Sequence, residues 1–257
     1  MILRRLGNKQ KIAKDIQVYF PSHKIYIEPF FGAGGMFFNK PKAETNILND
    51  LDSDVFNLFM VIKNDYYKLK ELLEITPYST DVFNYFKTSK EDSDIWKAVR
   101  FIYLSNFGFM GKPNTMKVDS RNHKENAVKN LNRTVDFLKD VDCKFINCDF
   151  RDVFKNISLS EENNIRKTFI YCDPPYLGTD DNYSNSFELG DLIDLVKLLI
   201  STGCKFAISE FKNDHIHDIV KNFDLHIIDI GERRNLGNRR TEILVTNYEN
   251  RQQSLFA

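Results

Sequence analysis

Several features that are common in proteins are scarce in this sequence of 257 residues. It contains four cysteines and one tryptophan, and its formal net charge is zero. The cysteines show no CxxC spacing and stand in or beside apolar runs, so we expect reduced core thiols and no metal site. No basic region followed by an apolar stretch opens the chain, and no run of about 18 apolar residues is present to span a bilayer. These absences predict a cytoplasmic protein without membrane contact.

The lack of net positive charge argues against contact with nucleic acid, because phosphate contacts normally leave a basic excess on the binding domain. The charge is unevenly distributed, however, and three stretches are locally basic: Arg4–Lys14, Lys112–Arg133 and Arg233–Arg240. A surface for a polyanion can be assembled from these stretches. For the first one, the alternative interpretation is a solvated basic face of a helix.

Apolar side chains are plentiful enough for a full core. Hydrophobic residues make up 42% of the chain and charged residues 28%, as is typical of a globular domain. Short β-branched and aromatic runs alternate with helical patterns, which predicts an α/β fold with a Rossmann-like, mostly parallel sheet. The seven predicted strands are Lys24–Pro29, Asn46–Asn49, Lys144–Asn147, Thr168–Cys172, Lys205–Ser209, Leu225–Ile230 and Glu242–Asn247.

A long segment between the second and third predicted strands has a helical pattern. Apolar residues recur at helical spacing from Trp96 to Phe107, and Gly108-Phe-Met-Gly then breaks the period. From there to Glu125 the chain has the composition of a polar, basic loop. We therefore predict an α/β domain of residues 1–65 and 142–257 with a helical insertion of residues 66–141.

Glycines follow the first predicted strand and precede a predicted helix, in the sequence Glu28-Pro-Phe-Phe-Gly-Ala-Gly-Gly. Where a strand turns into a helix, glycine lets the backbone approach a ligand. The spacing differs from GxGxxG and no Lys-Ser/Thr pair follows, which disfavours a phosphate-binding loop and a dinucleotide oxidoreductase. An ordinary tight turn is the alternative interpretation.

Acidic residues stand at the ends of the next two strands. Asp50 ends the second strand, where Rossmann-like folds use a carboxylate to accept both ribose hydroxyls. Its alternative role is the N-cap of the helix that starts nearby, since Asp is a good cap. Asp149 and Phe150 follow the third strand and are placed to bond to and stack on a nucleobase. Asp149 has the same alternative role as a cap of the next turn.

The most specific motif is Asp173-Pro-Pro-Tyr, directly after the predicted strand Thr168–Cys172. Pro174 and Pro175 fix the backbone and remove two amide donors, so nearby carbonyl groups stay free to accept hydrogen bonds. The Asp173 carboxylate and the Pro174 carbonyl can each accept an N–H of an exocyclic amine and aim its lone pair at a methyl donor. Tyr176 offers a flat face to a base that has left the duplex. The alternative is a Pro-Pro turn with Tyr176 as a core aromatic.

The order of these motifs resembles the DNA adenine N6-methyltransferases of the Dam type across nearly the whole chain. Leu6-Gly-Asn-Lys9 is similar to the N-terminal Gly-x-Lys segment of that family, Phe30-Phe-Gly-Ala-Gly34 to its Phe-x-Gly-x-Gly, and Asn49-Asp50 to its acidic strand end. The resemblance implies an S-adenosylmethionine-dependent methyltransferase sheet with a target-recognition insertion. It also implies methyl transfer to N6 of adenine in double-stranded DNA, with a restriction endonuclease as a partner in some cases.

By this resemblance, Arg5 and Lys9 border the cofactor, Asp50 holds its ribose, and Asp173 contacts both the cofactor side and the target amine. Arg5 departs from the family, which usually has an aromatic residue at that position. The expected cofactor-binding residues are Arg5, Lys9, Phe31, Gly32, Gly34, Asp50, Asp149, Phe150 and Asp173.

The segment expected to read DNA departs further from the family. Lys112-Pro-Asn-Thr-Met-Lys117 stands where the family has an Asn-Val-Pro-Phe-Gly-like stretch, so we assign no target sequence. Side chains suited to phosphates and base edges are present there and before the last strand. We expect DNA contacts from Lys112, Asn114, Lys117, Arg121, Asn122, Arg239 and Arg240. The alternatives are a solvated loop and ordinary loop charges.

Two other functions fit the same motifs. The first keeps the fold and methylates the cytosine amino group or an RNA base, because Asp-Pro-Pro-Tyr activates amines generally. The second is a non-catalytic nucleic-acid-binding module descended from such an enzyme. The intact Asp173–Tyr176 segment and Asp50 argue against this second function.

Overall fold

The chain is built around one mixed sheet. The computed structural model describes residues 1–4, 7–119, 121–155, 157, 159, 162–178, 187–234 and 239–249, except the side chains of Met110, Arg233, Arg234 and Arg239. Within these residues the strands are β1 (Ile25–Glu28), β2 (Thr45–Asn49), β3 (Asp142–Ile146), β4 (Thr168–Cys172), β5 (Lys205–Phe211), β6 (His226–Arg234) and β7 (Arg239–Thr246). All seven predicted strands are present, which confirms the expected Rossmann-like α/β sheet.

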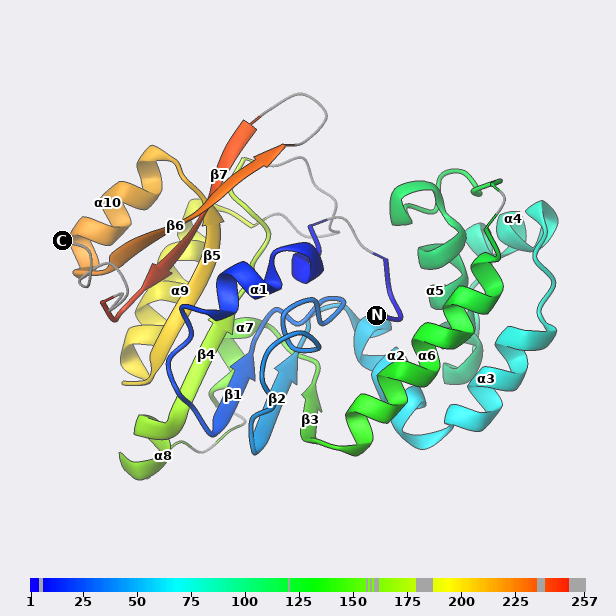
Figure 1. Cartoon of the computed structure of the whole chain (residues 1–257), viewed down its shortest axis with the longest axis horizontal. Helices are drawn as coiled ribbons and strands as arrows, with labels where there is room; N and C mark the ends of the chain where they lie inside the picture. The colour runs from blue at the N-terminus through cyan, green and yellow to red at the C-terminus, as the bar shows by residue number, and fades with distance from the viewer. Residues whose placement is uncertain are drawn as a thin grey trace.

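The strands lie in the order β3-β2-β1-β4-β5-β7-β6. The first five are parallel, whereas β7 is antiparallel to β5 and β6. Parallel strands bring their carboxyl ends to one edge, so the loops after β1, β2 and β4 meet there (Figure 1). β6 ends four residues later than predicted, because its pairing with β7 continues past an irregularity between Asp229 and Gly231.

Alternation along β4 divides the apolar core into two parts. Phe169 and Tyr171 face one cluster of buried side chains, and Ile170 and Cys172 face the other. This division follows from the two-residue period of a strand, and it explains why β4 is buried along its whole length. Each face of the sheet therefore has its own covering layer.

Short and long helices cover the two faces. Their bounds are η1 (Lys9–Lys11), α1 (Ala13–Gln17), α2 (Ser53–Asn64), α3 (Tyr66–Ile75), α4 (Thr80–Thr88), α5 (Asp94–Phe107), η2 (Phe109–Gly111), α6 (His123–Lys139), α7 (Phe150–Val153), α8 (Glu162–Lys167), α9 (Leu189–Ser201) and α10 (Asp214–Phe223). Helices α9 and α10 bury apolar residues against Ile170 and Cys172, and α1 packs on the opposite face with Phe169 and Tyr171. In the described residues, no helix is long and apolar enough to cross a membrane.

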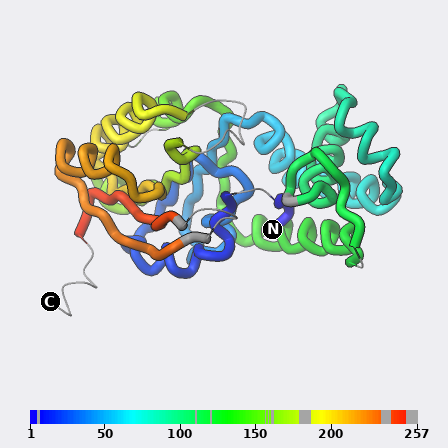
Figure 2. Tube along the Cα trace, turned by 90° about the horizontal axis from the view of Figure 1, so that it is seen from above, coloured from blue at the N-terminus to red at the C-terminus, as the bar shows by residue number. Residues whose placement is uncertain are grey.

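Helices α3 to α6 form a separate layer beside the β3 edge (Figures 1 and 2). α5 is their centre, because Val99 and Ile102 are fully buried and α2, α3, α4 and α6 all pack on it. The N-terminal segment joins this layer: Asn106 on α5 donates to the carbonyl oxygen of Ile2 at 2.7 Å. The layer corresponds to the predicted insertion, whose role as a separate unit stays a prediction.

Candidate active site

Loops from three strands meet the N-terminal segment at the carboxyl edge of the sheet. The amide of Phe31, after β1, donates to the carbonyl oxygen of Asn49, the last residue of β2, at 2.8 Å. Asn49 Nδ2 donates to the carbonyl oxygen of Pro29 at 3.0 Å. Lys9 of η1 reaches Asp173, which directly follows β4. Segments far apart in the sequence therefore border one site.

The glycine loop after β1 is shaped by positive backbone angles. Gly32 has a φ of 53° and Gly34 a φ of 72°, a region that side chains with a Cβ rarely adopt. A Cβ on Gly35 would lie 2.2 Å from Asn8 Oδ1, so this glycine lets the N-terminal segment approach. A Cβ on Gly32 would meet no atom within 4 Å, which leaves room for a ligand against its backbone.

The helix predicted after this glycine loop is not formed. The described residues between β1 and β2 contain turns instead, with two bonds of α-helical type, from the amide of Phe38 to the carbonyl oxygen of Gly34 and from that of Lys40 to Met36. The left-handed angle at Gly34 and the contact of Gly35 with Asn8 prevent a regular helix from starting there. The expected helix N-terminus at this loop is therefore wrong.

Asp50 is bonded to the glycine loop. Its Oδ2 accepts from the amide of Gly32 at 2.5 Å, and its Oδ1 accepts from the amide of Asp52 at 2.8 Å. The N-cap of α2 is Asp52, which accepts from Asp54 at 2.9 Å. Asp50 therefore does not take the alternative role of helix cap, and its carboxylate lies beside the open backbone of Gly32.

Asp149 does cap a helix. Its side chain accepts from the amide of Arg151 at 2.9 Å at the start of α7, as the alternative interpretation predicted. Its Oδ1 also lies 3.4 Å from the Arg151 guanidinium, which reaches Asp191 and Asp194 as well. Both bonds to Asp149 Oδ1 come from Arg151 of α7. The role of Asp149 that the structure shows is therefore to stabilise the start of this helix.

Aromatic residues line the outer side of the same edge. Phe150 is 6% exposed and lies 5.4 Å from Phe30 and 6.1 Å from Phe187 between ring centroids. The Arg151 guanidinium lies 4.4 Å from the centre of the Phe150 ring. Phe31 points the other way, into the core beside Phe59, and is 3% exposed. Sequence reasoning named Phe31, whose side chain lies in the core, and did not name Phe30, so cofactor contact by Phe31 stays a prediction.

Lys9 and Asp173 form an ion pair at the centre of the site. Lys9 Nζ contacts Asp173 Oδ1 and lies 3.6 Å from Glu242 Oε1. The Lys9 side chain is 3% exposed and that of Asp173 is 21% exposed, so the acid keeps one open side. Lys9 is therefore not part of a solvated basic face, which was the alternative for the N-terminal cluster.

The ring of Tyr176 is held by three neighbours. Its hydroxyl donates to Glu242 Oε1, and its ring meets that of Phe211 edge-on at 4.6 Å between centroids. Lys9 Nζ lies 4.5 Å from the centre of the ring. Pro174 is buried and Pro175 is half-buried between Asp173 and this tyrosine. Burial and the nearby Asp173 charge raise the pKa of the Tyr176 hydroxyl well above its ordinary value.

Three further acids are buried at this edge, and sequence reasoning missed all of them. Glu28, Glu210 and Glu242 are 2%, 0% and 1% exposed. Burial raises the pKa of Glu28 well above its ordinary value and that of Glu210 to about 8. Glu28 accepts from the Tyr26 hydroxyl at 2.8 Å. Glu210 accepts from the amides of Phe211 at 2.7 Å and Leu177 at 3.2 Å.

The sequence contained a signal for two of these acids, Glu28 and Glu210. Each stands at or near the end of a mostly apolar strand, as in Ile25-Tyr-Ile-Glu28. A charged residue at such a position is rarely buried without partners, so it marks either a strand end or a polar network.

The residues expected to contact DNA are distributed over two places. Lys112 and Asn114 are exposed between η2 and α6. Lys117 Nζ reaches the carbonyl oxygen of Asn106 at 3.4 Å, and burial together with the charges of Arg4 and Arg121 lowers the pKa of Lys117. Positive charge is thus concentrated between the N-terminal segment and this loop.

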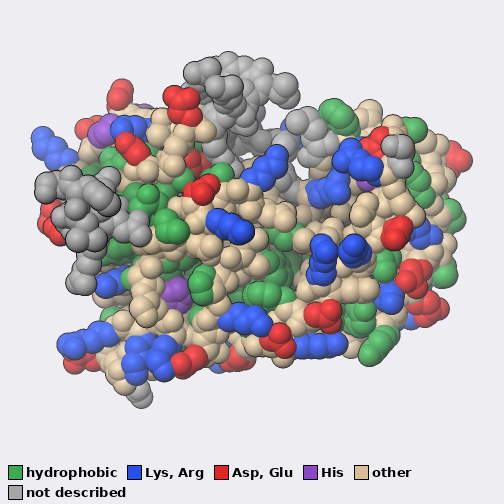
Figure 3. All heavy atoms as spheres, in the orientation of Figure 1, with side chains coloured by type: hydrophobic (Ala, Val, Ile, Leu, Met, Phe, Trp, Pro, Cys, Tyr) green, Lys and Arg blue, Asp and Glu red, His purple; other side chains and the backbone are tan. Residues whose placement is uncertain are grey.

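Two of the same residues have structural roles. Arg121 bonds to Asp119 through Nη2 at 2.8 Å, and Asn122 caps α6 by accepting from Glu125 at 3.0 Å. The segment predicted as loop up to Glu125 therefore ends earlier, because α6 begins at His123. Figure 3 shows Lys and Arg side chains over the middle of one face and over the helical layer.

Arg240 lies on the other side of the site. Its guanidinium lies 5.4 Å from the centre of the Phe211 ring. A cavity of about 520 Å³ opens there, lined by Leu177, Phe187, Phe211, Asn213 and Arg240 among others. Arg5 and the side chain of Arg239 lie outside the described residues, so their predicted contacts stay predictions.

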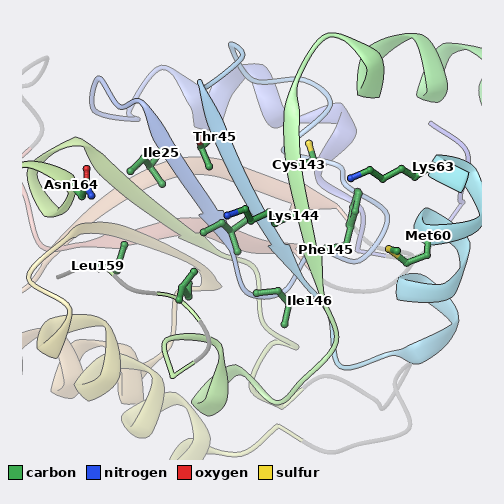
Figure 4. A pocket seen from close by; sticks show the side chains of 12 residues that line it. Ile25, Thr45, Met60, Lys63, Cys143, Lys144, Phe145, Ile146, Leu159 and Asn164 are labelled. Atoms are coloured by element: carbon green, nitrogen blue, oxygen red, sulfur yellow. The ribbon is translucent and has the colours of Figure 1, made fainter. Parts of the chain in front are cut away.

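A larger cavity of about 710 Å³ lies elsewhere, against β1, β2 and β3 (Figure 4). Its lining includes Ile25 and Thr45, which begin β1 and β2, and Lys144 and Leu159. No predicted site residue is among the residues that line it. Among the described residues, no group of three or more His, Cys, Asp or Glu side chains is arranged to hold a metal ion.

Comparison with known proteins gives one family and several relatives. The model of the D12 class N6 adenine-specific DNA methyltransferases matches residues 6–236. The type II methyltransferase M1.LlaDCHI of Lactococcus lactis subsp. cremoris is 25% identical over 95% of this chain and 94% of its own length. A DNA adenine methylase of Haemophilus influenzae is 31% identical over 76% of this chain and 73% of its own.

Among solved structures, one match is the rRNA methyltransferase aviRa of Streptomyces viridochromogenes. It matches 92% of this chain and 82% of its own length, with a TM-score of 0.44 and 11% sequence identity.

Proposed function

This chain belongs to the D12 class of N6 adenine-specific DNA methyltransferases, and we propose that it binds S-adenosylmethionine beside Gly32 and Asp50 and the target adenine at Asp173–Tyr176. The chain is an adenine-specific DNA methyltransferase, and adenine in DNA is its substrate. The contribution of each residue is the proposal. The observation that carries it is the Lys9–Asp173 ion pair, at the same strand edge as the Gly32–Asp50 bond.

The cofactor side is supported by the chemistry of the residues present. The space against Gly32 fits a ligand that lies close to the backbone, and the Asp50 carboxylate beside it is suited to accept the two hydroxyls of a ribose. Phe30 and Phe150 offer apolar surface for a nucleobase. The chemistry that S-adenosylmethionine supplies when bound is an electrophilic methyl group on a positively charged sulfur.

The acceptor side is supported by Asp173 and its loop. An exocyclic amine is a weak nucleophile because its lone pair is delocalised into the ring. Asp173 has an oxygen beside Lys9 and an open side, so it can accept one N–H of the amine, while the Pro174 carbonyl accepts the other. These two acceptors orient the lone pair toward the methyl group and keep the amine in place during transfer.

Tyr176 and the DNA-contacting residues hold the substrate in this proposal. A base inside a duplex cannot reach Asp173, so the adenine leaves the stack and lies on the Tyr176 ring. The helical layer of residues 66–141 then contacts the surrounding duplex through Lys112, Asn114 and Lys117, and Arg240 contacts it from the other side. Arg121 and Asn122 are weaker candidates for base contacts, because they already bond to Asp119 and Glu125.

Two further proposals concern a partner protein and the location of the chain in the cell. A restriction endonuclease as a partner has the support of one relative, whose name is that of a type II methyltransferase. Digestion of methylated and unmethylated DNA with extracts of the source cells would test it, since such a partner cuts only the unmethylated DNA. A cytoplasmic location follows from DNA as the substrate, and fractionation of the same cells would test it.

Product analysis tests the proposed site. The purified chain is incubated with labelled S-adenosylmethionine and double-stranded DNA, and the nucleosides are separated by mass. We expect N6-methyladenine from the wild type and none from Asp173→Ala, with cofactor binding retained in calorimetry. Turnover by Asp173→Ala, or N4-methylcytosine as the product, would contradict the proposal.

A further inference from the structure

We propose that Glu242 on β7 is a positioning residue for methyl transfer, which holds the hydroxyl of Tyr176 and shares the ammonium of Lys9 with Asp173. The inference depends on the proposed roles of Asp173 and Tyr176 at the target amine. Glu242 lies 66 residues after Tyr176 in the chain and is therefore outside the Asp-Pro-Pro-Tyr motif.

The antiparallel position of β7 brings Glu242 to the active edge. In the β5–β7 ladder, Glu242 stands opposite Phe211, so both side chains point to the same face of the sheet. Phe211 contacts the Tyr176 ring edge-on, and Glu242 contacts the hydroxyl at the end of that ring. If β7 were parallel to β5, its carboxyl end would lie at this edge. Glu242, which is near the start of β7, would then lie at the opposite edge of the sheet.

The burial of Glu242 makes its partners necessary. The residue is 1% exposed, and a carboxylate removed from water is strongly destabilising unless hydrogen bonds and an opposite charge compensate it. The Tyr176 hydroxyl and the Lys9 ammonium, 3.6 Å away, supply these two interactions. Lys9 is itself buried, so both charges stabilise each other in the site and neither is a surface ion.

The consequence for the reaction is geometric. Tyr176 is held at its hydroxyl by Glu242, at its face by Lys9 and at its edge by Phe211. Glu242 takes part in the first two of these, because it also attracts the ammonium that lies over the ring. Without its charge, Lys9 moves toward Asp173 alone, and the stacking plane of the target base is no longer fixed. Misplacement by about 1 Å can lower the rate of an enzyme by about 100-fold.

Three variants test this inference in the full-length chain. Glu242→Gln removes the charge and keeps an oxygen for the Tyr176 hydroxyl, Tyr176→Phe removes the hydroxyl alone, and the third variant combines both changes. Asp229→Asn on β6 is the matched control, since it makes the same chemical change in an exposed carboxylate that pairs with Lys212 at the surface. The readouts are kcat, KM for cofactor and DNA, and the fluorescence of 2-aminopurine placed at the target adenine.

We expect Glu242→Gln to lower kcat by about tenfold or more while both KM values stay within about threefold, since its effect is on orientation and not on binding. Tyr176→Phe should lower kcat less, and both variants should change the 2-aminopurine emission. If Glu242 acts through Tyr176, the combined variant is no more than about twofold slower than the slower single variant. Asp229→Asn should match the wild type.

Three results would overturn the inference. The first is a wild-type kcat in Glu242→Gln, and the second is a loss that appears only in KM. The third is a combined variant in which the two single losses multiply. If Glu242→Gln does not fold, Tyr176→Phe is the deciding variant. Wild-type kcat and wild-type 2-aminopurine emission in Tyr176→Phe would then show that the contact between the Tyr176 hydroxyl and Glu242 has no role in the reaction. Failure of the wild type to methylate adenine would instead overturn the proposed site.

Discussion

Lys9 and Asp173 are 164 residues apart in the chain and form one ion pair, in which the lysine is buried and the acid keeps an open side. The pair joins the N-terminal segment to the loop after β4. It therefore holds the N-terminal segment at the carboxyl edge of the sheet, so Lys9 is not part of a separate basic arm. The same lysine lies over the Tyr176 ring, so one cation contacts the acid and the aromatic residue of the Asp-Pro-Pro-Tyr segment.

Lys9→Met should remove most activity, because it keeps the length of the side chain and removes the charge between Asp173 and Glu242. We expect kcat to fall at least 100-fold, about 2.7 kcal/mol of transition-state stabilisation. The free energy of unfolding should fall by about 3 kcal/mol, since the buried Glu242 loses its cation. Steady-state kinetics and urea unfolding measure the two effects.

Lys11→Met is the control for this change. Lys11 is exposed on the same short helix η1 and should behave as the wild type in both measurements. Equal losses in the two variants would show that the charge of the segment matters and that the ion pair does not.

Asp50→Asn should weaken cofactor binding. The amide keeps one oxygen for the Gly32 or Asp52 backbone, but it loses the charge and the second acceptor that a ribose diol needs. We expect the Kd for S-adenosylmethionine to rise by about 10- to 100-fold, as for loss of a charged hydrogen bond. Calorimetry measures it, and Asp52→Asn serves as the control because Asn also caps helices well. An unchanged Kd in Asp50→Asn would exclude Asp50 from the cofactor site.

Gly35→Ala should disturb the site without touching any reacting group. The new Cβ would lie 2.2 Å from Asn8 Oδ1 and 2.9 Å from the Lys9 backbone nitrogen, so the N-terminal segment must shift. We expect a loss of stability of about 1–3 kcal/mol, as for overpacking, together with a clear loss of kcat. Gly190→Ala on α9 meets nothing within 4 Å and should be neutral or stabilising. Wild-type kcat in Gly35→Ala would show that the position of Lys9 is not critical.

Glu210 should make the protein less stable as the pH rises. Burial raises the pKa of Glu210 to about 8, whereas an unfolded glutamate titrates near its ordinary value. Between these two pKa values the folded state binds one proton more than the unfolded state, so the free energy of unfolding falls with rising pH. The fall is at most about 1.4 kcal/mol per pH unit and ends above the folded pKa.

Urea unfolding at pH 6, 7 and 8 measures this dependence. In Glu210→Gln the part of the pH dependence of the free energy of unfolding that comes from this group should be absent. The free energy of unfolding itself should be lower, because the single oxygen of Gln cannot replace both carboxylate oxygens, which accept from Phe211 and Leu177. The same slope in wild type and variant would assign the titration to another group.

The sequence predicted the sheet well, but it predicted only some of the residues that meet at the carboxyl edge of the sheet. The strands were evident because apolar runs such as Thr168–Cys172 are buried on both faces, and a parallel sheet makes that pattern continuous. The ends of the parallel strands then brought Gly32, Asp50 and Asp173 to one edge, as Rossmann-like folds require. No local sequence pattern indicates that β7 pairs antiparallel to β5. The position of Glu242 beside Tyr176 therefore could not be predicted without the tertiary structure.

Other differences between the expected and the observed structure have equally physical causes. Phe30 lies beside Phe150 and Phe31 packs into the core beside Phe59, and the motif alone does not say which of the two faces the core. The helix expected after the glycine loop is absent, because Gly34 and Gly35 adopt their conformation to admit the N-terminal segment. Asn122 stays a predicted DNA contact, and the structure shows that it also caps α6, as expected for Asn at a helix start.

The most direct test of the account is the quantity of N6-methyladenine formed in double-stranded DNA by the wild type, Asp173→Ala and Lys9→Met, measured in parallel by nucleoside mass spectrometry. The account predicts N6-methyladenine from the wild type, none from Asp173→Ala and at most about one hundredth of the wild-type rate from Lys9→Met. Wild-type product formation in either variant would contradict it, since the Lys9–Asp173 pair would then lie outside the chemistry.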